Sequence, residues 1–136
     1  MNSTYPTRSD LPAKLSTLWI FLMFNMVFAD IFSFMYPGAM ANIVAGVPTD
    51  GIVITPLFLL LAAGINEIPI AMVLLPRFLK PGVSRWVNIA GALVTIPYVR
   101  GLGSLNYPHY IFIAAIEVLT SLVIIAMAWK WRVVEA

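Results

Sequence analysis

Residues 110–129 read YIFIAAIEVLTSLVIIAMAW, and Glu117 is the one acidic or basic side chain among them. A helix needs about 20 predominantly apolar residues to cross roughly 30 Å of lipid hydrocarbon. Lys130 and Arg132 follow directly, as expected where a helix leaves a membrane. The stretch therefore predicts a transmembrane helix that carries one carboxyl group in its apolar interior.

Three further apolar stretches are long enough to cross a membrane, at about 15–36, 52–75 and 86–105. The first ends before Pro37-Gly38, and in the second Thr55-Pro56 is typical of an N-cap followed by the first helical residue. We expect residues 39–45 to form a short outer helix that ends at Gly46. The basic loop 76–84 should connect the second span to the third.

The third of these stretches is the least regular, because Arg85 and Arg100 bracket only residues 86–99. At 1.5 Å per residue this segment reaches about 21 Å, which is too short to cross. The helix is therefore expected to continue to about residue 105. This extension places Arg100 in the outer part of the membrane.

The composition agrees with an integral membrane protein. The chain has 136 residues, of which 61% are hydrophobic and 10% charged, and its mean hydropathy is +0.93. A soluble domain is nearer half apolar and a quarter charged. An ordinary soluble enzyme, a disordered chain and a nucleic-acid binder are excluded. Without cysteine, phosphate loop, nucleophile elbow or HExxH motif, we expect no enzyme activity and no cofactor.

The basic residues predict the orientation. Seven of the eight Lys and Arg residues fall on one side of the predicted spans: Arg8, Lys14, Arg77, Lys80, Arg85, Lys130 and Arg132. By the positive-inside rule, both termini are then cytoplasmic. We therefore expect residues 1–136 to form a single domain, a multi-pass four-helix bundle in a bacterial inner membrane. A cleaved signal peptide at 15–36 is the alternative, but the stretch is long for one and contains Asn25 and Asp30.

Four ionisable residues fall inside the predicted spans, namely Asp30, Glu67, Arg100 and Glu117. Such residues are costly in lipid, and each is by default a candidate for function. Helical rise places Asp30, Arg100 and Glu117 about 8, 9 and 11 Å below the outer face. We expect these three to form one charge-assisted cluster, with His109 and Tyr98 at a similar depth.

This cluster has a structural interpretation and a functional one. It can be a salt bridge that holds three helices together. One arginine, however, does not neutralise two carboxylates, and the surplus acid favours a binding site. Asp30, Glu117 and His109 also have the ligand types of a metal site, but no short-spacing motif supports one.

Glu67 is expected about 10 Å from the inner face, beside Asn66. It is either a neutral group bonded to Asn88 or a group that transfers protons or binds a ligand. Pro69 removes a backbone hydrogen bond to Ile65 one turn back.

Small and polar residues recur at helical spacing in three of the spans. In membranes such faces allow close helix approach and hydrogen bonds between helices, so we expect them to point inward. They are Ala63, Gly64, Glu67 and Ala71; Asn88, Gly91, Ala92 and Thr95; and Ala114, Glu117, Thr120, Ser121 and Ala128.

Several short motifs carry a resemblance. They are FADIF at 28–32, YPG at 36–38, NEIP at 66–69, RWVN at 85–88, IEV at 116–118 and AWKW at 128–131. Over nearly its whole length the chain resembles a family of small four-helix bacterial membrane proteins classed only as a domain of unknown function. It is more loosely similar in architecture to DoxX-type proteins. Neither resemblance implies an activity.

The function we expect is binding or transport of a small molecule or ion. Asp30, Arg100 and Glu117 would form the outer site, together with His109, and Glu67 and Asn66 an inner one. Four helices enclose little volume, so transport would call for a homodimer in the lipid bilayer. The alternative is a structural or accessory subunit whose partner supplies the activity. A membrane enzyme or quinone partner ranks last, because no nucleophile or redox group is present.

Overall fold

Each long helix has a proline as its first or second residue, where the missing backbone N–H leaves no donor unpaired in the first turn. The computed structural model describes residues 10–49 and 51–131, apart from the side chain of Leu102. In this part the protein has five helices: α1 (Leu11–Met35), α2 (Ala39–Val44), α3 (Pro56–Phe78), α4 (Pro81–Leu102) and α5 (Pro108–Trp129). The Thr55 hydroxyl accepts a hydrogen bond from the Phe58 N–H, which confirms the predicted cap of α3.

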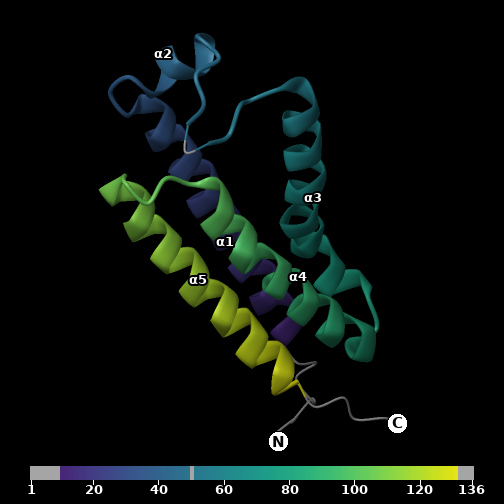
Figure 1. The fold of residues 1–136 in the computed structure, drawn as a ribbon. Helices are drawn as coiled ribbons and strands as arrows, with labels where there is room; N and C mark the ends of the chain where they lie inside the picture. The colour runs from purple at the N-terminus through teal and green to yellow at the C-terminus, as the bar shows by residue number, and fades with distance from the viewer. Residues whose placement is uncertain (1–9, 50, 132–136) are drawn as a thin grey trace, which may run out of the picture.

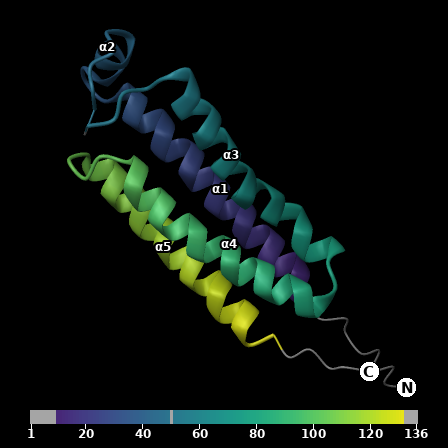
Figure 2. The same ribbon diagram turned by 45° about the vertical axis from the view of Figure 1, so that its right-hand side comes forward.

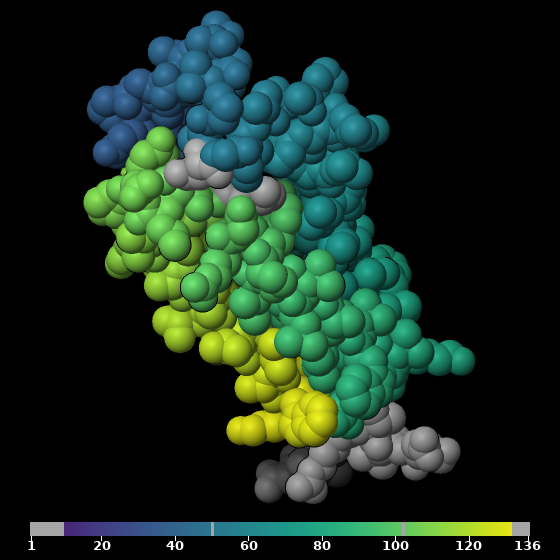
Figure 3. All heavy atoms as spheres, viewed as in Figure 1, coloured from purple at the N-terminus to yellow at the C-terminus, as the bar shows by residue number. Residues whose placement is uncertain are grey.

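The four long helices run side by side as an elongated bundle, and α2 lies across one end of it (Figures 1 and 2). Helix α1 packs against α5 and α3, and α4 packs against the same two helices. The space-filling view shows α2 and the segment after it covering one end of this bundle (Figure 3). The short helix expected at 39–45 is therefore confirmed as α2, which follows Gly38 with its positive φ of 84°.

Three of the helices, α1, α3 and α5, are long and apolar enough to cross a membrane. In their most apolar windows only 22%, 11% and 33% of the residues are buried within the fold. Large apolar side chains such as Phe24, Leu60 and Phe112 are consequently exposed. This pattern fits a membrane protein whose outer surface faces lipid. Helix α4 has a comparable length but is less apolar, since it carries Arg85, Asn88 and Arg100.

The turn between α3 and α4 is shorter than the sequence suggested. Helix α3 continues through Pro76 to Phe78, and α4 begins at Pro81 instead of residue 86 and ends at Leu102 instead of 105. The predicted loop 76–84 is therefore wrong, because Pro81 opens a helix instead of closing a loop. As a result Arg85 lies in the second turn of α4.

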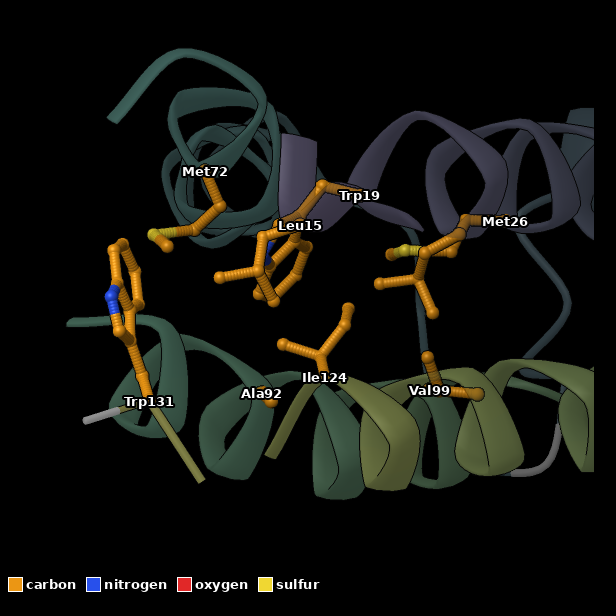
Figure 4. Packing of buried hydrophobic residues seen from close by; sticks show 9 residues of the cluster. Leu15, Trp19, Met26, Met72, Ala92, Val99, Ile124 and Trp131 are labelled. Carbon is orange, nitrogen blue, oxygen red and sulfur yellow. The ribbon is translucent and has the colours of Figure 1, made fainter. Parts of the chain in front are cut away.

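One half of the bundle has a dense core, built from α1, α3, α4, α5 and Trp131 (Figure 4). Trp19 is fully buried at its centre, and its indole Nε1 donates to Asn88 Oδ1 at 2.9 Å. Asn88 Nδ2 in turn donates to the Ser84 carbonyl at 2.8 Å. A Cβ on Gly91 would lie 3.2 Å from Met72 Cγ, so the small residue permits close packing of α3 on α4. We call this region the packed half.

All the described Lys and Arg residues except Arg100 lie at the end of the packed half, where α1 and α4 begin and α3 and α5 end; Figure 1 shows these helix ends. We call this the basic end; its members are Lys14, Arg77, Lys80, Arg85 and Lys130. Arg77 Nε donates to Ser16 Oγ at 3.1 Å, which ties the end of α3 to α1. Arg8 and Arg132, also counted for the predicted orientation, lie outside the described residues.

Prolines interrupt the backbone hydrogen bonding inside two helices. Pro69 lies inside α3 and Pro97 inside α4, and each removes a bond to the carbonyl four residues earlier. These carbonyls belong to Ile65 and Leu93. These two interruptions lie away from the basic end, whereas Pro76, a further proline inside α3, lies two residues before the end of that helix.

Candidate functional site

A cavity of about 440 Å³ occupies the half of the bundle away from the basic end. All four long helices contribute to it, and α2 and the segment before α3 close it at the bundle end. We call this region the hollow half. Most of the lining is apolar. Its polar members include Asp30, Ser33, Asn66, Tyr98 and Glu117.

The two carboxyl groups reach the cavity from α1 and α5. Glu117 is only 2% exposed, whereas Asp30 is exposed and lines the cavity. Glu117 belongs to the predicted inward face of α5, whose members Thr120, Ser121 and Ala128 are buried as expected. The placement of two acids around one cavity is the part of the predicted cluster that the fold retains.

Glu117 lacks a hydrogen-bond donor on one of its oxygens. Its Oε1 is buried and has no partner among the described residues, and the same holds for the Ser121 hydroxyl one turn further along α5. The Thr120 hydroxyl is already used, since it donates to the Ile116 carbonyl at 2.8 Å. A buried carboxylate without a donor is costly, so this oxygen is free to accept from a bound molecule.

Tyr110 connects the rim of the cavity to the end of α4. Its hydroxyl donates to the Val99 carbonyl, one of the last carbonyls of α4, which have no partner within the helix. A Cβ at Gly103 would run into the Tyr110 ring, so only glycine fits there. Nothing in the sequence pattern singled out this contact, because it joins residues across a turn.

Arg100 does not join the two acids, and the predicted three-residue cluster is wrong in this respect. Arg100 is exposed, is not part of the cavity lining and forms no ion pair within the described residues. Its neighbour Val99 is buried, and successive helical residues differ by about 100° in direction. With Val99 turned inward, the guanidinium points outward.

The second predicted site is also corrected, because Glu67 points away from the bundle. Glu67 and Gly64 are exposed on the face predicted to point inward, whereas Ala63 of the same face lines the cavity. The face of α3 that packs inward instead carries Asn66, which lines the cavity, and the buried residues Pro69, Met72 and Pro76. The proposed bond from Glu67 to Asn88 is absent, since Asn88 bonds Trp19 and Ser84. The inward face predicted for α4 is confirmed.

His109 lies beside the cavity and does not line it. It borders a separate shallow depression with Phe32, Met35, Tyr36 and Pro37. Its ring stacks on Tyr107 at 5.6 Å, and its Nε2 is 3.4 Å from the Ser33 hydroxyl. Within residues 10–49 and 51–131, no three His, Asp or Glu side chains gather closely enough to hold a metal ion. The acidic side chains that line the cavity are therefore Asp30 and Glu117.

These features define a small all-helical protein with several helices able to cross a membrane and an acidic cavity. The chain belongs to the Family of unknown function (DUF6326), which matches residues 7–136. The predicted resemblance to an uncharacterised family of small helical proteins is thereby confirmed. No curated protein and no solved structure matches the chain.

Proposed function

We propose that this protein binds a small organic cation in the cavity of its hollow half. The observation that carries the proposal is the Glu117 carboxyl, whose buried Oε1 has no donor and which shares one cavity with Asp30. Two carboxylates near each other in a low dielectric need compensating positive charge. Because Arg100 does not supply this positive charge, a bound cation or added protons would have to supply it.

The size and lining of the cavity favour an organic ammonium ion over a bare inorganic ion. Its volume of about 440 Å³ lies within the roughly 300–1,000 Å³ of small-molecule pockets. Apolar side chains such as Phe34, Phe58 and Ile43 match a hydrocarbon body. The carboxyls match an N–H-bearing charged head, and Asn66 and Tyr98 can add hydrogen bonds.

In this proposal α4 is the fourth span of a multi-pass bundle. Its 22 residues reach about 33 Å, enough to cross, and it packs against α3 and α5, which are themselves apolar enough to cross. The basic end then faces the cytoplasm of a bacterial cell, as the positive-inside rule expects. The cavity accordingly belongs to the outer half of the inner membrane.

A homodimer is part of the proposal, with α3 as the contact. Helix α3 is the least buried of the three most apolar helices, and it exposes Glu67 in its middle. A carboxyl group facing hydrocarbon needs a hydrogen-bond partner. Across a two-fold axis, the same group of a second copy would supply one, and the exposed Gly64, one turn before Glu67, permits close approach.

The binding proposal is tested with the purified protein in detergent micelles. The rate of unfolding at fixed temperature is compared with and without n-butylammonium, and n-butanol serves as the neutral control. A ligand at 100 times its Kd stabilises by about 2.7 kcal/mol, or roughly a hundredfold in rate. We expect slower unfolding with the amine alone, and loss of the effect in Glu117→Gln and Asp30→Asn. Equal effects of amine and alcohol would contradict a cation site, and no effect of either would favour the accessory-subunit alternative.

The dimer is tested separately by the mass of the protein in lipid nanodiscs. We expect Glu67→Ala to shift the population toward monomer, while Arg100→Ala, a charge removed elsewhere on the surface, leaves it unchanged. A wild-type protein that is monomeric in lipid at all concentrations would rule out this assembly.

A further inference from the structure

The side chain of Arg85 lies beside a pair of contacting tryptophan rings at the basic end. Its guanidinium carbon is 5.4 Å from the centre of the Trp86 ring and 5.2 Å from that of Trp129. The two ring centres are 6.2 Å apart, and the rings are nearly perpendicular, at 88°. Cations within about 6 Å of an indole face are attracted by the ring. The start of α4 and the end of α5 thus hold one guanidinium in a defined position.

This arginine is positioned but not fully paired. Its Nε is buried and has no hydrogen-bond acceptor among the described residues. A guanidinium has five N–H donors, and a buried donor without an acceptor is costly. The two rings are 58% and 59% exposed, which is unusual for tryptophan in a packed protein. An acceptor that approaches from outside does not reach the buried Nε, but it would meet the outer part of the Arg85 guanidinium beside two exposed indole rings.

The surroundings are positively charged. Lys80 directly precedes α4, and Lys130 directly follows Trp129. Helix α4 begins here with a partial positive charge and α5 ends here with a partial negative one, so the positive charge of the site comes from its side chains. The acceptor that fits this environment is an anion.

We infer that Arg85, Trp86 and Trp129 form a binding site for the phosphate of an anionic phospholipid headgroup. The planar guanidinium matches phosphate oxygens, and Trp86 and Trp129 match the interfacial region of a lipid, where indole rings are enriched. A free phosphate ion would use the guanidinium but not the exposed rings. The site is separate from the cavity, and it stands whether or not the cavity binds a cation.

The test uses the full-length protein with phosphatidylglycerol or phosphatidylcholine that carries bromine on the acyl chains. Bromine quenches tryptophan fluorescence on contact, so the readout does not depend on the stability of the fold. We expect the wild type to be quenched at lower mole fractions of phosphatidylglycerol than of phosphatidylcholine. In Arg85→Gln this preference should fall about fivefold, the contribution of one basic residue near an anionic surface.

Two matched variants separate a site from general charge. Arg100→Gln removes the same charge at the other end of α4 and should keep the full preference. Arg85→Lys keeps the charge but loses the planar donor group, and should keep only part of the preference. An undiminished preference in Arg85→Gln, or an equal loss in Arg100→Gln, would overturn the inference. Suppression of the preference by millimolar inorganic phosphate would overturn the lipid assignment in favour of a free-phosphate site.

Discussion

At the centre of the packed half, three polar side chains bond one another; at the cavity of the hollow half, the buried carboxyl of Glu117 has an oxygen without a donor. Trp19, Asn88 and Ser84 form an unbroken chain of hydrogen bonds between α1 and α4. Glu117, equally well buried on α5, leaves Oε1 without a donor at the edge of the cavity. Helices α1, α3, α4 and α5 contribute residues to both regions.

The difference separates polarity used for folding from polarity kept for another purpose. A satisfied buried network fixes how the helices pack. An unpaired carboxyl destabilises the fold, and unpaired groups of this kind concentrate at functional sites. The comparison therefore connects the packed half with structure and supports the binding proposed for the hollow half, and each of the following measurements can break that distinction.

The largest expected contrast concerns truncation of apolar side chains in the two halves. Leu22→Ala creates a void in a close-packed core and should destabilise the protein by about 2–5 kcal/mol. Phe58→Ala only enlarges an existing cavity and should cost less than about 1 kcal/mol, since few contacts are lost. Unfolding rates at fixed temperature in one detergent give both values. Similar losses in the two variants would mean that the cavity is packed in solution.

The second measurement concerns the Trp19–Asn88 bond. Asn88→Ala leaves the buried indole N–H without an acceptor and should destabilise by about 1–3 kcal/mol. Trp19→Phe removes the orphaned donor but leaves a void of its own, so the double variant should be less unstable than the sum of the single ones. Strict additivity would show that the two side chains do not interact.

The smallest expected effect is that of Glu117→Gln without ligand. Removing one partner of a buried ion pair costs about 3–5 kcal/mol, but Glu117 has no such partner in the described chain. The variant should therefore unfold no faster than the wild type, and it should unfold more slowly if the carboxyl is charged. The unfolding rate at fixed temperature in the same detergent tests this expectation. Markedly faster unfolding would make Glu117 a structural counter-ion and would remove the distinction between the halves.

The presence of the long helices could be predicted from the sequence, because the length of an apolar stretch and the positions of its prolines are local properties. The direction of individual side chains was predictable only in part. The inward faces of α4 and α5 followed from their small and polar residues, but the same rule failed for α3. There the face that packs carries Pro69, Met72 and Pro76, whereas Glu67 points outward.

The candidate site shows the same limit. Depth along a helix follows from residue counting, which brought Asp30 and Glu117 to one level. Direction around the helix depends on how the neighbours pack, and a single step of about 100° separates the buried Val99 from the exposed Arg100. Contacts across turns, such as Tyr110 on the end of α4, follow from the tertiary arrangement and have no periodic signal.

Pro69 and Pro97 affect how easily two walls of the cavity can bend. Each lies close along its helix to a residue that lines the cavity, Asn66 on α3 and Tyr98 on α4. A helix without a backbone bond at one position bends there more easily, since bending breaks no further bond. The segments of α3 and α4 beyond these prolines, toward α2, should therefore bend more easily than the segments held by the Trp19–Asn88 bond. A ligand would enter and leave by one side only, unless that connection also opened.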